Sequence, residues 1–211
     1  MTPAPLLGLG LALTAAAGMI DAVGFVELGG YYTSFMSGNT TQLGAAIADP
    51  GVVLLPLGLV AMFFLGSFGG TLVAGHGNWH GTLRVLGLVL ATLTLSLALT
   101  VLGIPPQLSM LPLAFAAGAQ NAVLVQRGSV RVGATFVTGT LFAAGQDLAR
   151  GLRGDVPVMR WLQHVLVWAA LLLGAAMGAL VYVWWHIWAL ALPAAIYALM
   201  FAGFALRRSN S

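Results

Sequence analysis

Long apolar runs separated by short polar breaks dominate the pattern of this chain. Six runs are long enough to cross a bilayer as helices, which takes about 20 residues; they cover residues 5–26, 52–75, 83–103, 107–125, 161–183 and 185–206. Two shorter segments, 33–48 and 134–149, are rich in Thr, Ser and Gly, so at membrane depth they need protein or water around them. The pattern predicts an all-α polytopic membrane protein with six long transmembrane helices and two short polar segments, which re-enter the membrane or form short spans.

The order of these elements, a long run, a polar segment and two long runs, occurs twice. The tripeptide Ala-Ala-Gly at 16–18 returns at 116–118, and Asn121 stands in the second copy where Asp21 stands in the first. After a shift of one residue the agreement resumes, with Phe35, Gly38 and Gly44 matched by Phe136, Gly139 and Gly145. Such self-similarity indicates a duplication. We expect a single membrane domain, with repeat one over residues 1–103 and repeat two over 104–211, and a functional site where the repeats meet.

Pairs of glycines four residues apart extend the duplication beyond these blocks. Gly66 and Gly70 in the first copy are echoed by Gly174 and Gly178 in the second. Small residues at this spacing let helix backbones approach closely in lipid. Because such motifs serve contacts within a chain and between chains alike, the pattern leaves a homo-oligomer open.

The two signature blocks identify a family resemblance. The block from Gly18 to Gly44 contains Asp-Ala-Val-Gly-Phe at 21–25 and Ser-Gly-Asn-Thr-Thr at 37–41, and the second block contains Val-Thr-Gly-Thr-Leu at 137–141. Together they resemble the YoaK-like family of bacterial integral membrane proteins, a domain of unknown function, over nearly the whole chain. The resemblance implies a multi-pass protein of the bacterial inner membrane and implies no activity.

Composition agrees with a lipid environment. Of the 211 residues, 60% are hydrophobic and 6% are charged, whereas an ordinary globular domain carries about 25% charged residues. All the basic residues are arginines scattered between apolar runs, so we expect the bilayer and not nucleic acid as the partner. The absence of cysteine excludes disulfides, thiolate metal sites and a cysteine nucleophile.

The arginines also favour one topology. If both polar segments cross the membrane, Arg84, Arg127 and Arg131 lie on one face while Arg150, Arg153, Arg160, Arg207 and Arg208 lie on the other. If both segments re-enter, all of these arginines fall on one face, and the two repeats have opposite orientations. Because cytoplasmic loops collect Lys and Arg, we expect inverted repeats with both termini in the cytoplasm. The pair Tyr31-Tyr32 argues against this topology, because two tyrosines suit the membrane interface at the end of a short full span.

Polar residues in and near the two short segments form the predicted site. A short helix that starts inside the membrane points unsatisfied amide groups and a positive dipole end at its surroundings, and two such starts from opposite faces suit an anion or a small polar solute. Asp21 is the one ionisable member, since its counterpart Asn121 carries no charge, and proton coupling follows as a hypothesis. The alternative is that these side chains cap and join helices. The predicted substrate-binding residues are Asp21, Ser34, Ser37, Asn39, Thr40, Thr41, Gln42, Asn121, Thr135, Thr138, Thr140 and Gln146.

The leading functional hypothesis is a small secondary transporter or facilitator for an unidentified small solute. A non-transporting membrane scaffold or accessory subunit is the alternative, and an intramembrane enzyme is the third class. We expect no enzyme activity, because no in-span histidine aligns with a hydroxyl. We also expect no cofactor and no metal. His76 and His80 have the spacing of two metal ligands on a helix, but the glycines around them form a loop that does not hold that geometry. Asp147 is interpreted as a helix-end acid paired locally with Arg150, and His164 as an isolated interfacial histidine.

Overall fold

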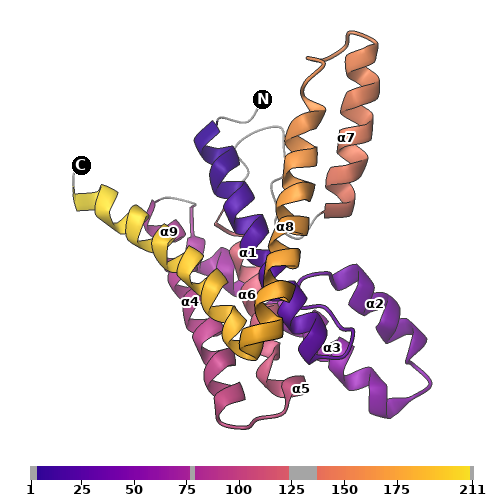
Figure 1. Cartoon of the computed structure of the whole chain (residues 1–211), viewed down its shortest axis with the longest axis vertical. Coiled ribbons are helices and arrows are strands. Elements are labelled where there is room, and N and C mark those ends of the chain that lie inside the picture. Colours follow the sequence, from indigo (N-terminus) through magenta and orange to yellow (C-terminus); the bar gives the residue numbers. More distant parts are fainter. Residues whose placement is uncertain (1–3, 77–78, 124–136, 210–211) are drawn as a thin grey trace.

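The computed structural model describes residues 4–76, 79–123 and 137–209, and within these ranges all regular structure is helical (Figure 1). The helices are α1 (Ala4–Glu27), α2 (Met36–Ala45), α3 (Pro50–Ala74), α4 (Trp79–Val101), α5 (Pro106–Ser109), α6 (Leu111–Gln120), α7 (Val137–Leu152), α8 (Trp161–Trp185), the 3-10 turn η1 (His186–Leu190) and α9 (Ala191–Ser209). The expected all-α class is confirmed, and the short polar segments are present as α2 and α7.

Within the described residues, four stretches are long and apolar enough to cross a membrane: Ala4–Glu27, Gly51–Ala74, Trp79–Val101 and Trp161–Leu206. The last contains 46 residues, and at about 1.5 Å per residue a straight helix of that length would be more than twice as long as the apolar core of a bilayer is thick. The chain instead reverses at His186, whose φ of 47° ends α8. Figure 1 shows α9 turning back from the lower end of α8, so the predicted spans 161–183 and 185–206 are separate helices.

The predicted span 107–125 is not a continuous long helix. It is divided into α5, of four residues, and α6, of ten. Pro112 lies in the first turn of α6 and has no N–H to donate to the preceding turn. The carbonyl oxygen of Ser109 lies at this break and accepts a hydrogen bond of 2.6 Å from the Ser96 hydroxyl on α4. The break is therefore stabilised by a neighbouring helix, and residues 124–136 lie outside the described part.

Glycines bring the long helices into contact in parallel pairs. A Cβ atom at Gly174 of α8 would collide with the carbonyl group of Ala15 on α1, and one at Gly178 would lie 2.7 Å from the Met19 Cα atom. From the first contact to the second, the residue number rises along both helices, so α1 and α8 run parallel. The pair α3 and α6 has the same arrangement, with Gly66 against Phe115 and Gly70 against Ala119. The predicted glycine pairs thus mark points of close backbone approach.

The long helices α4 and α9 run antiparallel. The ring of Trp79, at the start of α4, stacks on that of Phe204, near the end of α9, with centroids 4.6 Å apart. Further along α4, Gly87 faces Phe201. Because the start of one helix meets the end of the other, α4 and α9 have opposite directions.

The two short helices are placed on hairpins that leave the bundle. α2 packs on α3 and α7 packs on α8, and Figure 1 shows the second hairpin at the top and the first at the lower right. With ten residues and a rise of about 1.5 Å per residue, α2 covers only about half of a bilayer core.

The outer faces of the long helices are apolar. Side chains from α3, α8 and α9 that are 65% to 74% exposed include Leu54, Phe64, Leu72, Leu173, Leu180 and Leu199. An apolar surface of this extent needs lipid or protein against it, in agreement with the four candidate spans.

Candidate functional site

The carboxylate of Asp21 holds the turn that precedes α2. Its Oδ1 atom accepts hydrogen bonds from the Thr33 amide at 2.8 Å, the Thr33 hydroxyl at 2.9 Å and the Ser34 amide at 2.8 Å. Its Oδ2 atom accepts one from the Ser34 hydroxyl at 2.8 Å. One turn further along α1, Gly24 leaves room for the Thr33 methyl group, with which a Cβ atom would collide. Four donors satisfy this charge, so the geometry gives Asp21 the role of a clamp.

Asn39 fixes the same loop from the other side. Its side chain is fully buried, with Nδ2 donating to the Tyr32 carbonyl at 2.6 Å and Oδ1 accepting from the Tyr32 amide at 3.0 Å. The Asn39 side chain thereby satisfies both backbone groups of Tyr32, as a neighbouring strand would. Both ends of the Asn39 side chain are used inside the loop, although Asn39 does not cap α2, whose N-cap residue is Phe35.

The start of α2 offers few donors to a ligand. The amides of Met36, Gly38 and Asn39 donate to Ser34 or Phe35 carbonyls at 3.1 to 3.3 Å, and those of Thr33 and Ser34 donate to Asp21. The Asp21 carboxylate therefore holds two amides that precede the helix, and an anion at the helix start stays a prediction.

The remaining polar residues of the first block lie on or near the surface of α2. Ser37, Thr40 and Thr41 are exposed, and the two threonine hydroxyls donate to carbonyls four residues earlier, at 2.7 and 3.0 Å. Such bonds within one turn leave these hydroxyl protons engaged with the helix. Gln42 differs, because it reaches back to the loop and donates to the Gly30 carbonyl at 3.0 Å.

The predicted residues of the second copy lie on other elements. Asn121 follows α6 and donates to the Ala117 carbonyl at 3.1 Å, while Thr140 is buried on α7 and Thr138 and Gln146 are exposed there. Thr135 lies outside the described residues. Since α2 packs on α3 and α7 on α8, the described polar residues of the two blocks are divided between separate hairpins.

A buried charged cluster joins α7 to α8. Asp147 Oδ2 lies 3.2 Å from His164 Nε2 and 2.9 Å from Arg160 Nε, and both the aspartate and the histidine are buried. The Nε–H of Arg160 makes no aligned hydrogen bond, so this contact is an ion pair without directional bonding. Asp147 thus pairs with α8 instead of Arg150, and His164 is not isolated.

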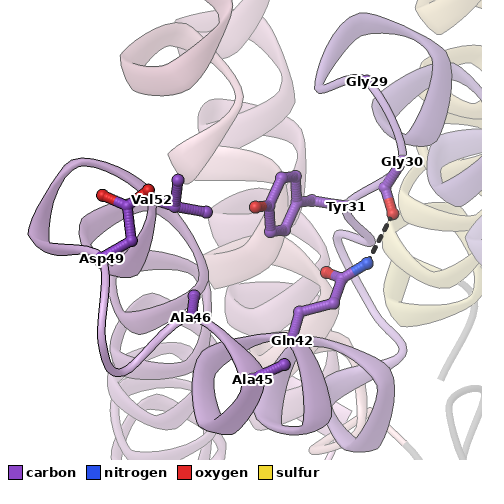
Figure 2. Close-up of a pocket in the computed structure, with 8 residues that line it drawn as sticks. All are labelled: Gly29, Gly30, Tyr31, Gln42, Ala45, Ala46, Asp49 and Val52. Atoms are coloured by element: carbon purple, nitrogen blue, oxygen red, sulfur yellow. Dashed lines mark hydrogen bonds between the residues drawn. The ribbon is translucent and has the colours of Figure 1, made fainter.

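A cleft of about 470 Å³ lies between the loop after α1, the outer side of α2 and the start of α3. Figure 2 shows the Tyr31 ring projecting into it toward Val52 and Asp49, with Gln42 below the ring. The Oε1 atom of Gln42 is buried without a hydrogen-bond partner. The lining residues are Gly29, Gly30, Tyr31, Gln42, Ala45, Ala46, Asp49 and Val52.

Among these lining residues, sequence reasoning predicted only Gln42 as a binding residue, and it gave Tyr31 the different role of an interfacial anchor. Asp49 and Tyr31 belong to a surface that forms when the α2–α3 hairpin closes on the loop, and their spacing along the chain carries no signal of it. Among the described residues, no group of three or more His, Asp or Glu side chains is placed to hold a metal ion.

Comparison with known proteins places the chain in a family. The family model described as "Protein of unknown function (DUF1275)" matches residues 9–203. The chain belongs to this DUF1275 family. It is also similar to the UPF0700 transmembrane protein RA0705 of Rhizobium meliloti (strain 1021), at 34% identity over 81% of this chain and 75% of that protein. No solved structure matches the chain.

Membership of DUF1275 agrees with the resemblance to the YoaK-like family and confirms that the family has no described function. The relative's description as a transmembrane protein agrees with the several apolar helices found here. The chain is therefore a transmembrane protein of a family without a described activity.

Proposed function

We propose that this DUF1275 protein is a small transporter or facilitator that carries a small solute between two halves of opposite orientation. The observation that carries the proposal is the antiparallel course of α4 and α9, whose ends meet at Trp79 and Phe204. If the halves are copies, α4 and α9 are equivalent helices, and only an axis in the membrane plane relates antiparallel equivalents. Inverted repeats with short interrupted helices are the usual plan of secondary transporters.

The reciprocal glycine contacts support the duplication over residues 1–103 and 104–211. Gly18 of α1 packs on the backbone of Leu171 and Ala175 in α8, and Gly118 of α6 packs on Phe63 and Ser67 in α3. The α6 glycine lies 100 residues after the α1 glycine, and the contacted residues of α8 lie 108 residues after those of α3. The second contact is therefore the first one with the two repeats exchanged. Each half thereby supplies a helix to the other.

In this proposal α2 and α7 are re-entrant and both termini are cytoplasmic. The short α2 helix supports re-entry, because ten residues cover about 15 Å. Asp21 holds the re-entrant loop in place, and coupling of transport to protons through Asp21 is a separate hypothesis. Replacement by Asn tests that coupling, because Asn keeps an oxygen acceptor and cannot carry the charge.

The experiment is a flux measurement on purified protein in liposomes. Stopped-flow swelling would compare protein-containing and empty vesicles for neutral polar solutes and for salts of small organic cations and anions. The proposal predicts accelerated flux for one chemical class. A denatured sample reconstituted at the same protein-to-lipid ratio controls for leakage through damaged bilayers.

A scaffold or accessory subunit is the second candidate. The hydrogen bonds of Asp21 and Asn39 favour this candidate, because both side chains bind the loop before α2. Groups used in this way do not line a passage for a solute. Vesicles whose permeability matches that of empty liposomes across the whole series would favour the scaffold over the transporter.

A further inference from the structure

The cleft beside Tyr31 has the chemical features of a binding site. Its volume is about 470 Å³, which is enough for a small solute, and it is open to its surroundings. The clamp residues Asp21, Thr33 and Ser34 are not among its lining residues. The cleft is therefore not explained by the clamp.

Two oxygen acceptors face this cleft without being used up by the fold. Gln42 is held by the bond from Nε2 to the Gly30 carbonyl, which leaves its buried Oε1 atom without a hydrogen-bond partner. Asp49 accepts from the Gly51 amide through one carboxylate oxygen at 3.0 Å. A buried carbonyl oxygen without a partner is costly, and a ligand with N–H groups would satisfy it.

Tyr31 supplies the aromatic wall of the same cleft. Figure 2 shows its ring between Gln42 on one side and Asp49 with Val52 on the other. The face of an aromatic ring attracts cations, most often guanidinium groups. An amide oxygen, a carboxylate and an aromatic ring therefore line one space.

Local charge also favours a cation. Asp49 is the one charged residue among those that line the cleft, and its side chain is exposed. A cleft lined by one sign of charge concentrates ions of the opposite sign. An anionic solute would be repelled at this position.

Two charged side chains occupy the corresponding positions in the second hairpin. With the repeat offsets of 101 for α2 and α7 and 108 for α3 and α8, Ala46 and Val52 correspond to Asp147 and Arg160. That pair forms an ion pair of 2.9 Å between α7 and α8, whereas the small apolar pair leaves the cleft open. The two hairpins therefore differ at the position that decides whether a solute can be accommodated.

We propose that this cleft binds a small monovalent organic cation bearing N–H donors, such as a guanidinium or primary ammonium compound. The inference rests on the proposed transport function, for which it names the substrate class. Gln42 Oε1 accepts an N–H, the Asp49 carboxylate pairs with the charge, and the Tyr31 ring packs on the planar face of the cation.

Methylguanidinium is the probe, because it stays charged at neutral pH. Its neutral isostere methylurea, tetramethylammonium as a cation without N–H groups, and acetate as an anion are matched comparisons. Equilibrium dialysis with the full chain in nanodiscs measures binding, and uptake into proteoliposomes of the same preparation measures flux. We expect methylguanidinium to bind at least about tenfold more tightly than methylurea, because charge-assisted hydrogen bonds are the stronger ones.

Variants separate the site from general effects. Asp49→Asn keeps the cap of α3, since Asn caps as well as Asp, and should weaken methylguanidinium binding about fivefold, as expected for an exposed ion pair. Gln42→Leu should weaken it about tenfold through the lost hydrogen bond to a charged donor. Asp155→Asn, at an exposed aspartate paired with Arg153, removes the same charge elsewhere and should leave binding unchanged.

The outcomes distinguish the two proposals. Equal affinity for methylurea and methylguanidinium, or an Asp49→Asn variant that binds like wild type, overturns the cleft assignment whatever the flux. Binding that follows the predicted order without any flux overturns the transport function and leaves the cation site in place. Thermal melting of Gln42→Leu alongside wild type shows whether its loss of binding reflects unfolding. If Gln42→Leu is unfolded, the binding of methylguanidinium to Asp49→Asn decides whether the cleft is the site.

Discussion

Replacing Asp21 should destabilise the fold to an extent that depends on the new side chain. Asp21→Ala removes the acceptor of four hydrogen bonds, two of which come from the amides of Thr33 and Ser34. Both residues are buried, and a backbone amide cannot rotate to another acceptor as a hydroxyl can. A buried donor without a partner costs about 1–3 kcal/mol, so the two amides predict a loss of about 2–6 kcal/mol.

Asp21→Asn is the matched replacement. Its carbonyl oxygen can accept the three bonds now made to Oδ1, and its amide nitrogen can donate to the Ser34 hydroxyl. The expected loss is therefore below about 2 kcal/mol, the cost of making hydrogen bonds to a neutral instead of a charged acceptor.

Reversible unfolding in bicelles, followed by circular dichroism, measures both losses. Hydrogen exchange over residues 28–36 supplies a local readout, since the amides of Thr33 and Ser34 should exchange much faster in Asp21→Ala. Thr40→Ala, at an exposed hydroxyl bonded within its own turn, should change stability by less than about 0.5 kcal/mol. A loss below about 1 kcal/mol for Asp21→Ala, with unchanged exchange, would refute the clamp, because two orphaned buried amides cost more than that.

Two further substitutions test the packing between helices. Gly174→Ala should cost about 1–3 kcal/mol by overpacking, because its Cβ atom would collide with the Ala15 carbonyl group; Gly8→Ala, with nothing within 4 Å, should be neutral or slightly stabilising, and equal effects of the two on unfolding would contradict the close approach. Asp147→Ala should cost about 3 kcal/mol, and the double change Asp147→Leu with Arg160→Met should recover much of it, since a buried ion pair can often be replaced by apolar side chains. If the double variant is no more stable in the same unfolding assay than Asp147→Ala, the loss does not come from the unpaired arginine.

The long helices and the glycine contacts follow from patterns that the sequence carries openly. Apolar runs of span length and small residues four apart are local signals, and Gly174 and Gly178 do mark close backbone contacts. What these signals lack is the partner. Nothing in the spacing says that Gly174 meets α1 of the other half, because that depends on how the helices assemble.

The broken helix and the polar contacts needed information beyond the pattern. Apolar periodicity over 107–125 continues through the break, for which Pro112 is the local signal. The hydrogen bond from Ser96 to the Ser109 carbonyl comes from a separate helix, which the pattern does not reveal. Asp21 was recognised as unusual, yet its donors lie in a loop whose course no periodicity fixes. His164 reaches Asp147 only because α7 folds back on α8.

Opposite orientation of the two halves is the central claim, and labelling of single cysteines tests it most directly. The chain contains no cysteine, so Ala48→Cys after α2 and Asp155→Cys after α7 can each be probed alone with a membrane-impermeant maleimide on intact cells. Inverted halves predict that position 48 is labelled from outside and that position 155 is labelled only after the cells are opened. Labelling of both positions from the same side would contradict the inversion.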